Sequence, residues 1–516
     1  MAWPEQARRV AAKLFYGNPL YRLTLAGAVP AAVQMVPADP WAGDAAAGAG
    51  LVAGGEPTVG DMAIDHDFAW LADLQAVRSQ EAVSLARQRV ATWIATHGRW
   101  GLPAWRPDVL GRRLSRWLAA HDFLCDGADD EFTRACLAAL AAQARHLGRV
   151  AGGAEANAGA FDVARGLIDC ALYLPGRANR LTNALSCLGR EINRQILPDG
   201  GHVQRSPALH LAVLKTLIAV RGALVVDHAE VPTAVQNAID RMTPMLRALR
   251  LGDGGLVQFN GTAAVPATMI DTVLAQVGTT ARALAAAPHS GFQRLTAART
   301  TVVVDTGRPH SGPGGSAGTL AFEMSSGRHR LIINCGAHPD NDAAWRDRLR
   351  GTAAHSTVIV DDRDSTEIVP DGVRQGPATV AVDRRQGEGN TWLDLSHDGY
   401  VSSFGLVHER RLYLASSGDD LRGEDCLVGS GGRAFAVRFH LHPSLQASMN
   451  QARSTVLMKP PSGRGWQMQA AGGGIDLEES VTFIDGARKR TSQIVVSGPL
   501  QGDGATIKWR FSRIRD

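Results

Sequence analysis

The first residues suited to chemistry lie in the segment LPDGGHVQRSPALH, residues 197–210. Its DGG turn brings His202 and Arg205 onto a loop, and Ser206 and Pro207 are typical of a helix start. A guanidinium can pair with a carboxylate through two hydrogen bonds, and a helix N-terminus also attracts anions. We therefore expect an anion-binding site here. The alternative is a plain capping turn, which needs neither the histidine nor the arginine.

A second group of candidates consists of histidines in the C-terminal half, where β-sheet packing requires none of them. They are His310, His329, His338, His355, His397, His408, His440 and His442. The FHLH sequence predicts that His440 and His442 share one face of a strand, because side chains alternate along strands. Such a pair is compatible with a metal site or with a polar face lining a cleft.

Two of these histidines have neighbours that suggest proton transfer. His355 stands before the predicted strand STVIVDD, and the sequence SHDGY places His397 and Tyr400 on a predicted loop. An imidazole and a phenol close together supply a base and an acid for catalysis. The alternative interpretation of SHDGY is an ordinary surface turn.

The elements that position these residues change character along the chain. After an irregular or helical lead-in over residues 1–62, helical periodicity begins near 63 and continues to about 286. The predicted helices cover 80–97, 109–122, 130–149, 155–175, 178–196, 207–225, 231–250 and 266–286. Short connections between them favour antiparallel helix pairs, as a bundle or a toroid. From about 289 to 516, short β-branched segments separated by turns predict an antiparallel β-sandwich.

Composition narrows the function classes. A net charge of +4 without a basic stripe argues against a nucleic-acid interface. The Gly-rich segment 251–261 has neither the preceding strand nor the downstream acid of a dinucleotide site. The six cysteines form no CxxC pair, so neither a zinc finger nor a disulfide framework is expected. We expect no membrane span and a cytoplasmic location, with the periplasm as the alternative.

The ordered series of motifs resembles the heparinase II/III-like proteins, especially their alphaproteobacterial group. The resemblance runs over nearly the whole chain, through these segments: FAWLADLQAV, LPDGGHVQRSP, FNG, AGTLAFEMSSGRHRLIINCG, GTAAHSTVIVDD, HDGYVSSFGLVHERRLYL, GEDCLV, FHLHP and QIVVSG. It implies an α+β multidomain protein with an N-terminal incomplete α/α toroid at 63–288, followed by the antiparallel β-sandwich.

The resemblance also implies an activity. Family members are polysaccharide lyases that neutralise a uronate carboxylate, abstract the C5 proton and eliminate the 4-O-linked sugar. The expected catalytic residues here are His202, Tyr400, His355 and His397. The expected substrate-binding residues are Arg205, Asn260, His210 and His310. Enolate-like intermediates need such donors aimed at the carboxylate, and the expected partner is an acidic polysaccharide or oligosaccharide.

Several positions depart from the family pattern. Leu209 stands where these lyases usually carry a catalytic Tyr, and Ser316 stands where they carry a His. The family's structural zinc implies ligands at His355 and Asn334, although Asn is a poor zinc ligand. These departures leave a second hypothesis open, a non-catalytic glycan-binding or assembly protein on the same scaffold. A glycoside hydrolase needs two cleft carboxylates, and no such pair stands out. The oligomeric state stays open, with a dimer as one option.

Overall fold

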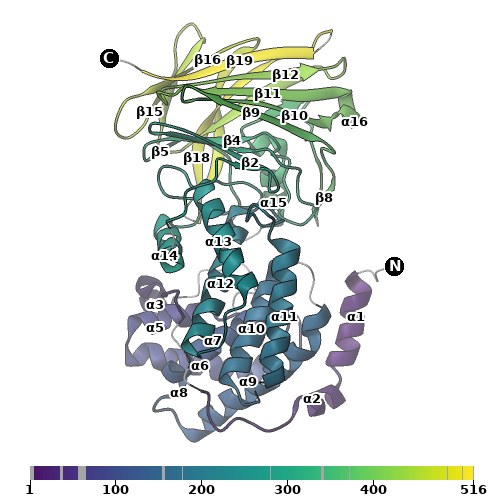
Figure 1. The fold of residues 1–516 in the computed structure, drawn as a ribbon, viewed down its shortest axis with the longest axis vertical. Helices are drawn as coiled ribbons and strands as arrows, with labels where there is room; N and C mark the ends of the chain where they lie inside the picture. Colours follow the sequence, from purple (N-terminus) through teal and green to yellow (C-terminus); the bar gives the residue numbers. More distant parts are fainter. Residues whose placement is uncertain are drawn as a thin grey trace. The chain divides into compact units, whose positions relative to one another are not determined.

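The structure is a computed structural model that describes residues 5–34, 36, 39–55, 66–153, 157–176, 178–278, 280–338, 342–370, 372–484, 486–502 and 504–514. The chain forms two compact units. The first comprises residues 1–195 and 215–238, and the second comprises residues 196–214 and 239–516. Figure 1 shows helices α1 to α14 in purple to teal and the strands in teal to yellow.

Helices dominate the N-terminal half of the described chain. They are α1 (Glu5–Tyr16), α2 (Pro19–Leu25), α3 (Ala45–Val52), α5 (Trp70–Val77), α6 (Gln80–His97), α7 (Pro107–Ala119), α8 (His121–Cys125), α9 (Asp130–Val150), α10 (Gly159–Tyr173), α11 (Ala178–Gln195), α12 (Pro207–Val226), α13 (Thr233–Ala248) and α14 (Ala267–Val277). A single 3₁₀ turn, Ala151–Gly153, follows α9. Helix α10 packs between α7 and α11.

Helices α6, α9, α11 and α12 agree with the predicted ranges to within one residue, and side-chain caps mark the starts of two of them. At α6 the Ser79 hydroxyl accepts a hydrogen bond from the backbone N–H of Ala82 at 3.2 Å. At α9 the Asp129 carboxylate accepts one from Phe132 at 2.7 Å. Such side chains satisfy N–H groups that the helix itself leaves unpaired. The helix predicted from about 63 is first seen at Trp70, and its residues 63–65 lie outside the described residues.

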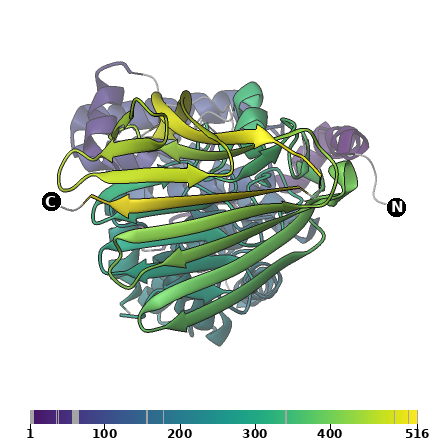
Figure 2. The same ribbon diagram turned by 90° about the horizontal axis from the view of Figure 1, so that it is seen from above.

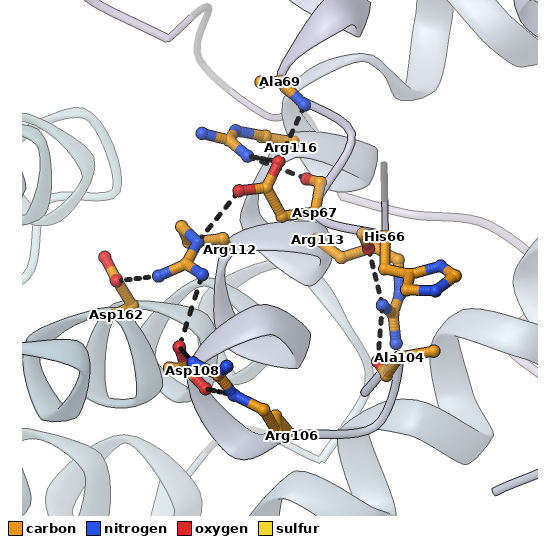
Figure 3. A network of polar contacts seen from close by, with 10 residues as sticks. All are labelled: His66, Asp67, Ala69, Ala104, Arg106, Asp108, Arg112, Arg113, Arg116 and Asp162. Carbon is orange, nitrogen blue, oxygen red and sulfur yellow. Dashed lines mark hydrogen bonds and ion pairs between the residues drawn. The ribbon is translucent and has the colours of Figure 1, made fainter. Parts of the chain in front are cut away.

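An arginine network ties α7 to its neighbours (Figure 3). The Arg112 guanidinium donates to the carboxylates of Asp67, Asp108 and Asp162 at 3.0, 3.3 and 2.7 Å. Burial lowers the pKa of Arg112, but the three carboxylates outweigh that effect and raise it. Next to it, the buried Arg113 lies over the Trp93 ring at 4.1 Å, and burial lowers its pKa to about 9. Polar contacts therefore help to hold this helical unit together.

Helix α12 is long and apolar enough to cross a membrane by length and composition, with a mean hydropathy of 1.8. It is the only such helix in the part of the chain that the structure describes, and 61% of its apolar window is buried within the protein. The core helix of a globular protein has the same properties, so this one helix is weak evidence for a span.

Strands dominate the C-terminal half. They are β1 (Ala286–Ala287), β2 (Phe292–Ala297), β3 (Thr300–Asp305), β4 (Phe322–Ser326), β5 (His329–Ile333), β6 (Val358–Val360), β7 (Glu367–Val369), β8 (Gly372–Gln375), β9 (Val380–Gly387), β10 (Asn390–Tyr400), β11 (Leu406–Leu414), β12 (Asp420–Val428), β13 (Ala434–Leu441), β14 (Gln446–Met449), β15 (Thr455–Lys459), β16 (Trp466–Ala471), β17 (Gly474–Ile484), β18 (Ala487–Pro499) and β19 (Gly504–Arg513). Short helices α15 (Ala343–Arg350) and α16 (Val401–Phe404) and a 3₁₀ turn (Thr352–Ala354) interrupt them.

Among the described residues, most of these strands form two large antiparallel sheets, and β7 pairs with β8 in a separate two-stranded sheet. One has the order β1-β2-β3-β4-β5-β13-β18-β17, with β6 also paired to β13, and the other has the order β14-β15-β16-β19-β12-β11-β10-β9. A shared hydrophobic core, which includes Phe322, Phe439 and Trp509, takes side chains from both sheets. The predicted antiparallel sandwich, preceded by helices, is thus confirmed.

Two local predictions were wrong. The sequence SHDGY was expected to be a loop, but it is the end of strand β10, and the Tyr400 ring belongs to the sandwich core. His442 was expected to share a strand face with His440, but β13 ends at Leu441 and leaves His442 outside it. The compact units also divide differently from a boundary at 288, because residues 196–214 and 239–288 fold with the sheets.

Candidate functional site

Arg205 is the centre of a buried cluster in the second unit. It lies in the left-handed backbone region, with φ of 58°, and its side chain is 7% exposed. Nε donates to the carbonyl of Ser290 at 2.7 Å, Nη1 donates to that of Arg308 at 2.7 Å, and Nη2 donates to that of Gly291 at 3.1 Å. Nη2 also forms an ion pair with Asp305. The guanidinium is thus held by groups of its own chain.

Asn260 completes this cluster from the loop after Phe259. Its Nδ2 donates to the Arg205 carbonyl at 3.1 Å and to the Asp305 carboxylate at 3.2 Å. Its Oδ1 accepts a hydrogen bond from the Ser316 hydroxyl at 3.2 Å. Arg205, Asn260 and Ser316 therefore lie together, and each has hydrogen-bond partners inside the protein. A buried network with its members satisfied is rigid.

The local sequence explains why this loop folds as it does. The Asp199 carboxylate accepts hydrogen bonds from the backbone N–H groups of His289 and Ser290 at 2.9 and 2.7 Å. Gly201 lies against Ser290, and a Cβ there would come within 2.4 Å of that side chain. A Cβ at Gly307 would come within 2.4 Å of the Arg205 guanidinium. The DGG turn is therefore needed for close packing onto the start of the sheet.

Three predicted histidines surround the cluster. His202 is 1% exposed, and burial lowers its pKa to about 3, with further lowering from His210 and His310. His210 is buried as well. It donates from Nε2 to the Met242 carbonyl at 2.9 Å, and its pKa falls to about 4. His310 is half-buried, and burial and the Arg205 charge lower its pKa. All three imidazoles are therefore neutral near pH 7.

His355 lies on an adjoining part of the same loop system. Its ring packs against Gly318, where a Cβ would come within 2.9 Å of Nδ1. The side chain is 4% exposed, neither ring nitrogen makes a hydrogen bond of normal geometry, and burial lowers its pKa to about 4. No hydrogen bond joins His355 to His202 or Arg205. It is a neutral imidazole with spare hydrogen-bonding capacity.

The residues at the expected zinc position do not fit a zinc site. The Asn334 side chain is committed at both ends, since Oδ1 accepts from Ser356 at 2.9 Å and Nδ2 donates to Glu323 at 3.0 Å. In the part of the chain that the structure describes, no group of three or more His, Cys, Asp or Glu side chains is arranged to hold a metal. His355 alone is insufficient, because structural zinc takes four ligands.

His397 belongs to a different network, inside the sandwich. Its Nδ1 accepts a hydrogen bond from the Gly399 N–H at 3.0 Å, so the ring proton is on Nε2, which donates to His408 at 3.1 Å. His408 donates in turn to Asp425 at 2.8 Å, and Arg410 donates to both oxygens of that carboxylate. Burial raises the pKa of Asp425, but the Arg410 charge and His408 lower it more strongly.

Tyr400 is fully buried near the same network. Its hydroxyl donates to the Val358 carbonyl at 2.8 Å, and burial raises its pKa far above the usual value. The structure therefore separates the predicted residues into two sets. One set lies around Arg205, namely His202, Asn260, His210 and His310, with His355 adjoining it. The other consists of Tyr400 and His397, whose hydrogen bonds lie within the sandwich interior.

Sequence reasoning missed the acids that organise both sets. Asp305 pairs with Arg205 across 100 positions of sequence, and Asp425 joins His408, Arg410 and Trp509, whose indole N–H donates to it at 2.7 Å. Each acid ends or interrupts an apolar strand pattern, as in TTVVVD and GEDCLV. A charged residue inside an apolar strand was the available signal, because buried carboxylates need a partner.

The family comparison covers most of the chain. Residues 91–277 match the family described as heparinase II/III N-terminus, and residues 279–510 match heparinase II/III-like, C-terminal. A curated relative, FtsZ-localized protein C of Caulobacter vibrioides, is 33% identical over 471 residues, which cover 87% of this chain and 81% of the relative.

Solved structures share the fold at low identity. A heparinase III has a TM-score of 0.71 at 11% identity, covering 87% of this chain and 76% of that one. The heparan sulfate lyase HepC of Pedobacter heparinus has a TM-score of 0.61 at 16% identity, with the same two coverages. These likenesses show the toroid-plus-sandwich fold.

Proposed function

Because the chain belongs to the heparinase II/III-like family, we propose that it uses a polysaccharide lyase scaffold to bind a uronic-acid-containing polysaccharide without cleaving it. The fold and the family make glycan binding a reasonable expectation, whereas cleavage of the glycan depends on the particular residues of the site. The proposal separates these two contributions and assigns the protein to binding and assembly.

One observation carries the proposal, the internal pairing of Arg205. A lyase must neutralise the uronate carboxylate before a base can remove the C5 proton. Here the guanidinium is already paired with Asp305 and donates to three backbone carbonyls. Pairing with a substrate would require breaking a buried ion pair, which costs several kcal/mol, on the order of 3–5. Arg205 therefore acts as a positioning residue for the loop.

Tyr400, whose phenol the lyase mechanism would use, is also engaged in a hydrogen bond within the protein. Tyr400 donates to the Val358 carbonyl in the core, and Leu209 stands at the position of the usual catalytic tyrosine. Beside this cluster the half-buried His310 offers a neutral imidazole, which suits hydrogen bonding to a sugar hydroxyl.

The curated relative supports an assembly role. Its name describes it by localisation with FtsZ, and the two chains match over most of their lengths. We extend that role to this chain, so that glycan binding and association with FtsZ filaments belong to one protein. Co-sedimentation with polymerised FtsZ is the direct measurement. Protein left wholly in the supernatant would remove the assembly part of the proposal. The cytoplasmic location stays a prediction.

The second candidate function is the lyase itself, and one observation favours it. His202 and His355 are neutral imidazoles, which is the protonation state that a general base requires. In this alternative, one of them removes the C5 proton from a uronate that lies beside Asn260, and the double bond forms as the 4-O-linked sugar leaves.

A single experiment separates the two candidates. The full chain is incubated with hyaluronan, heparan sulfate, alginate and polygalacturonate, and ultraviolet absorbance reports any new double bond while retention on the immobilised polymers reports binding. We expect retention on at least one polymer without absorbance growth. Absorbance that grows with the native chain and with His329→Ala, but not with His202→Ala, establishes the lyase. Neither retention nor absorbance with any polymer rejects both candidates.

A further inference from the structure

A groove lies on the outward face of the sheet that contains β9 to β12, β16 and β19. Its volume is about 630 Å³, within the usual range for ligand sites. Figure 2 looks onto this sheet, with β9 to β12 in green and β19 in yellow. Along β11 the burial pattern alternates, so Leu412 points into the core while Arg411 and Tyr413 point outward. The groove is separate from the cluster around Arg205, which lies at the start of the other sheet.

The strand register arranges the lining residues, together with Asp383 on the edge strand β9, into two rows that cross six strands. The first row, from β9 to β16, is Arg385, Trp392, Tyr413, Arg422, Arg510 and Gln469. The second row is Asp383, Asp394, Arg411, Glu424, Lys508 and Ala471. Strands lie ~4.8 Å apart, so each row extends over roughly 24 Å. That length suits an extended chain molecule lying across the strands.

The first row contains two neighbouring aromatic side chains. The rings of Trp392 and Tyr413 are directly opposite one another, with centroids 5.3 Å apart and planes tilted by 44°. The Tyr413 hydroxyl donates to Asn390 at 3.1 Å, and the Arg422 guanidinium lies over the Tyr413 ring at 5.6 Å. Both rings are half-buried and line the groove. They form a preorganised platform onto which the apolar face of a flat ring can stack.

The charges around the platform are largely compensated by shared ion pairs. Arg411 donates to Glu424 at 2.8 Å, and Lys508 lies 3.4 Å from the same carboxylate. Asp420 receives hydrogen bonds from Arg422 at 2.9 Å and from Arg510 at 2.7 Å. In the same way, Arg385 pairs with Asp383 and Asp394. The groove therefore carries alternating donors and acceptors, and its five cations exceed the four carboxylates by a single charge, which is a small excess for attracting a polyanion or an acidic peptide.

From this register we propose that the groove is a carbohydrate-binding site for a run of neutral sugar units. The sugar rings stack on Trp392 and Tyr413, and their hydroxyls, each a donor and an acceptor, bond to the paired guanidinium and carboxylate groups. This inference rests on the proposed function in that the ligand is a glycan. It adds a second site with a different sugar chemistry from the uronate expected near Arg205.

The test uses calorimetric titration of the full chain with chitohexaose and cellohexaose as neutral probes. A hexagalacturonate and a peptide of repeated Asp and Glu are the acidic probes. We expect saturable binding of at least one neutral probe, weakened about tenfold or more in Trp392→Ala and in Tyr413→Ala. Trp392→Phe should retain part of the affinity, because it keeps an aromatic face. Trp345→Ala is the matched control, since Trp345 is a half-buried aromatic elsewhere in this unit.

The outcomes separate this site from the proposed function. No binding of either neutral probe overturns the groove assignment, while retention on uronate polymers still supports the proposed function. Binding of the acidic peptide alone, lost in Trp392→Ala, identifies the groove as a peptide site and also overturns the assignment. Neutral binding that is unchanged in Trp392→Ala and Tyr413→Ala places the sugar elsewhere. Neutral binding with no uronate retention keeps the groove and removes the uronate proposal.

Discussion

Two arginine networks, one in each unit of the protein, are built in opposite ways. In the helical unit, Arg112 shares three carboxylates and its side chain remains 27% exposed. In the sandwich, one carboxylate, Asp425, serves Arg410 and His408, and all three side chains have no exposure at all. Because Arg112 has several carboxylate partners and is partly exposed to solvent, the first network should tolerate the loss of one carboxylate. The second network depends on Asp425 alone, because among the described residues this is the only carboxylate that pairs with Arg410 and His408 in the solvent-excluded interior.

Removing Asp425 is the largest predicted perturbation. In Asp425→Ala the Arg410 charge stays buried with only the carbonyls of Leu320 and Ser356 as partners. We expect the free energy of unfolding to fall by about 3–5 kcal/mol. Denaturant titration followed by tryptophan fluorescence measures it. The matched control is Glu424→Ala, whose exposed ion pairs are worth only about 0–1 kcal/mol. Equal losses in the two variants would remove the contrast between the networks.

The cluster around Arg205 should give the next largest effect. In Asp305→Ala the guanidinium keeps three backbone carbonyls, so we expect a loss of about 2–3 kcal/mol in the free energy of unfolding. If Arg205 only positions the loop, uronate polymer binding should be weakened without any appearance of absorbance. A gain of double-bond absorbance in Asp305→Ala would instead show that the freed guanidinium can serve catalysis. Arg374→Ala, at an exposed ion pair, is the control.

Acid should destabilise the sheet unit through its buried neutral histidines. The pKa of His355 falls from 6.5 to about 4 on burial, so the unfolded chain binds more protons between these values. The contribution of neutral His355 to the free energy of unfolding is therefore fully present above about pH 6.5. It falls as the pH drops toward 4, by about 1 kcal/mol per pH unit for one such histidine. Denaturant titrations at several pH values should show a shallower fall in His355→Gln. An unchanged slope would mean that His355 is not neutral in the fold.

Local elements could be predicted from the sequence, and long-range partners could not. The helix at 80–97 was predicted with its observed bounds because helical periodicity is a property of neighbouring residues. Arg205 was singled out, but its partner Asp305 lies 100 positions away, and no spacing rule connects them. The sequence around Arg205 would be the same whether its guanidinium bound a substrate carboxylate or a carboxylate of the protein itself.

The strand that ends at Tyr400 shows why a buried polar residue makes a strand hard to predict from sequence. Its inward position His397 is polar, so the alternation that identifies a half-buried strand was hidden and a loop was predicted. The polarity is tolerated only because His408 and Asp425 continue the hydrogen-bond chain. The groove was missed for a related reason, since its rows consist of residues from six strands that become neighbours only through register.

The smallest predicted effect belongs to the helical network. Asp162→Asn removes one carboxylate charge from Arg112 but leaves Asp67 and Asp108, and the amide oxygen can still accept the hydrogen bond that Arg112 donates at 2.7 Å. We therefore expect a loss of only about 1 kcal/mol in the free energy of unfolding. Asp122→Asn, at a side chain that is 77% exposed, should change nothing measurable. A loss in Asp162→Asn as large as that in Asp425→Ala would mean that redundancy of partners does not protect a buried arginine. The number of carboxylates around each guanidinium would then no longer explain why the two units differ.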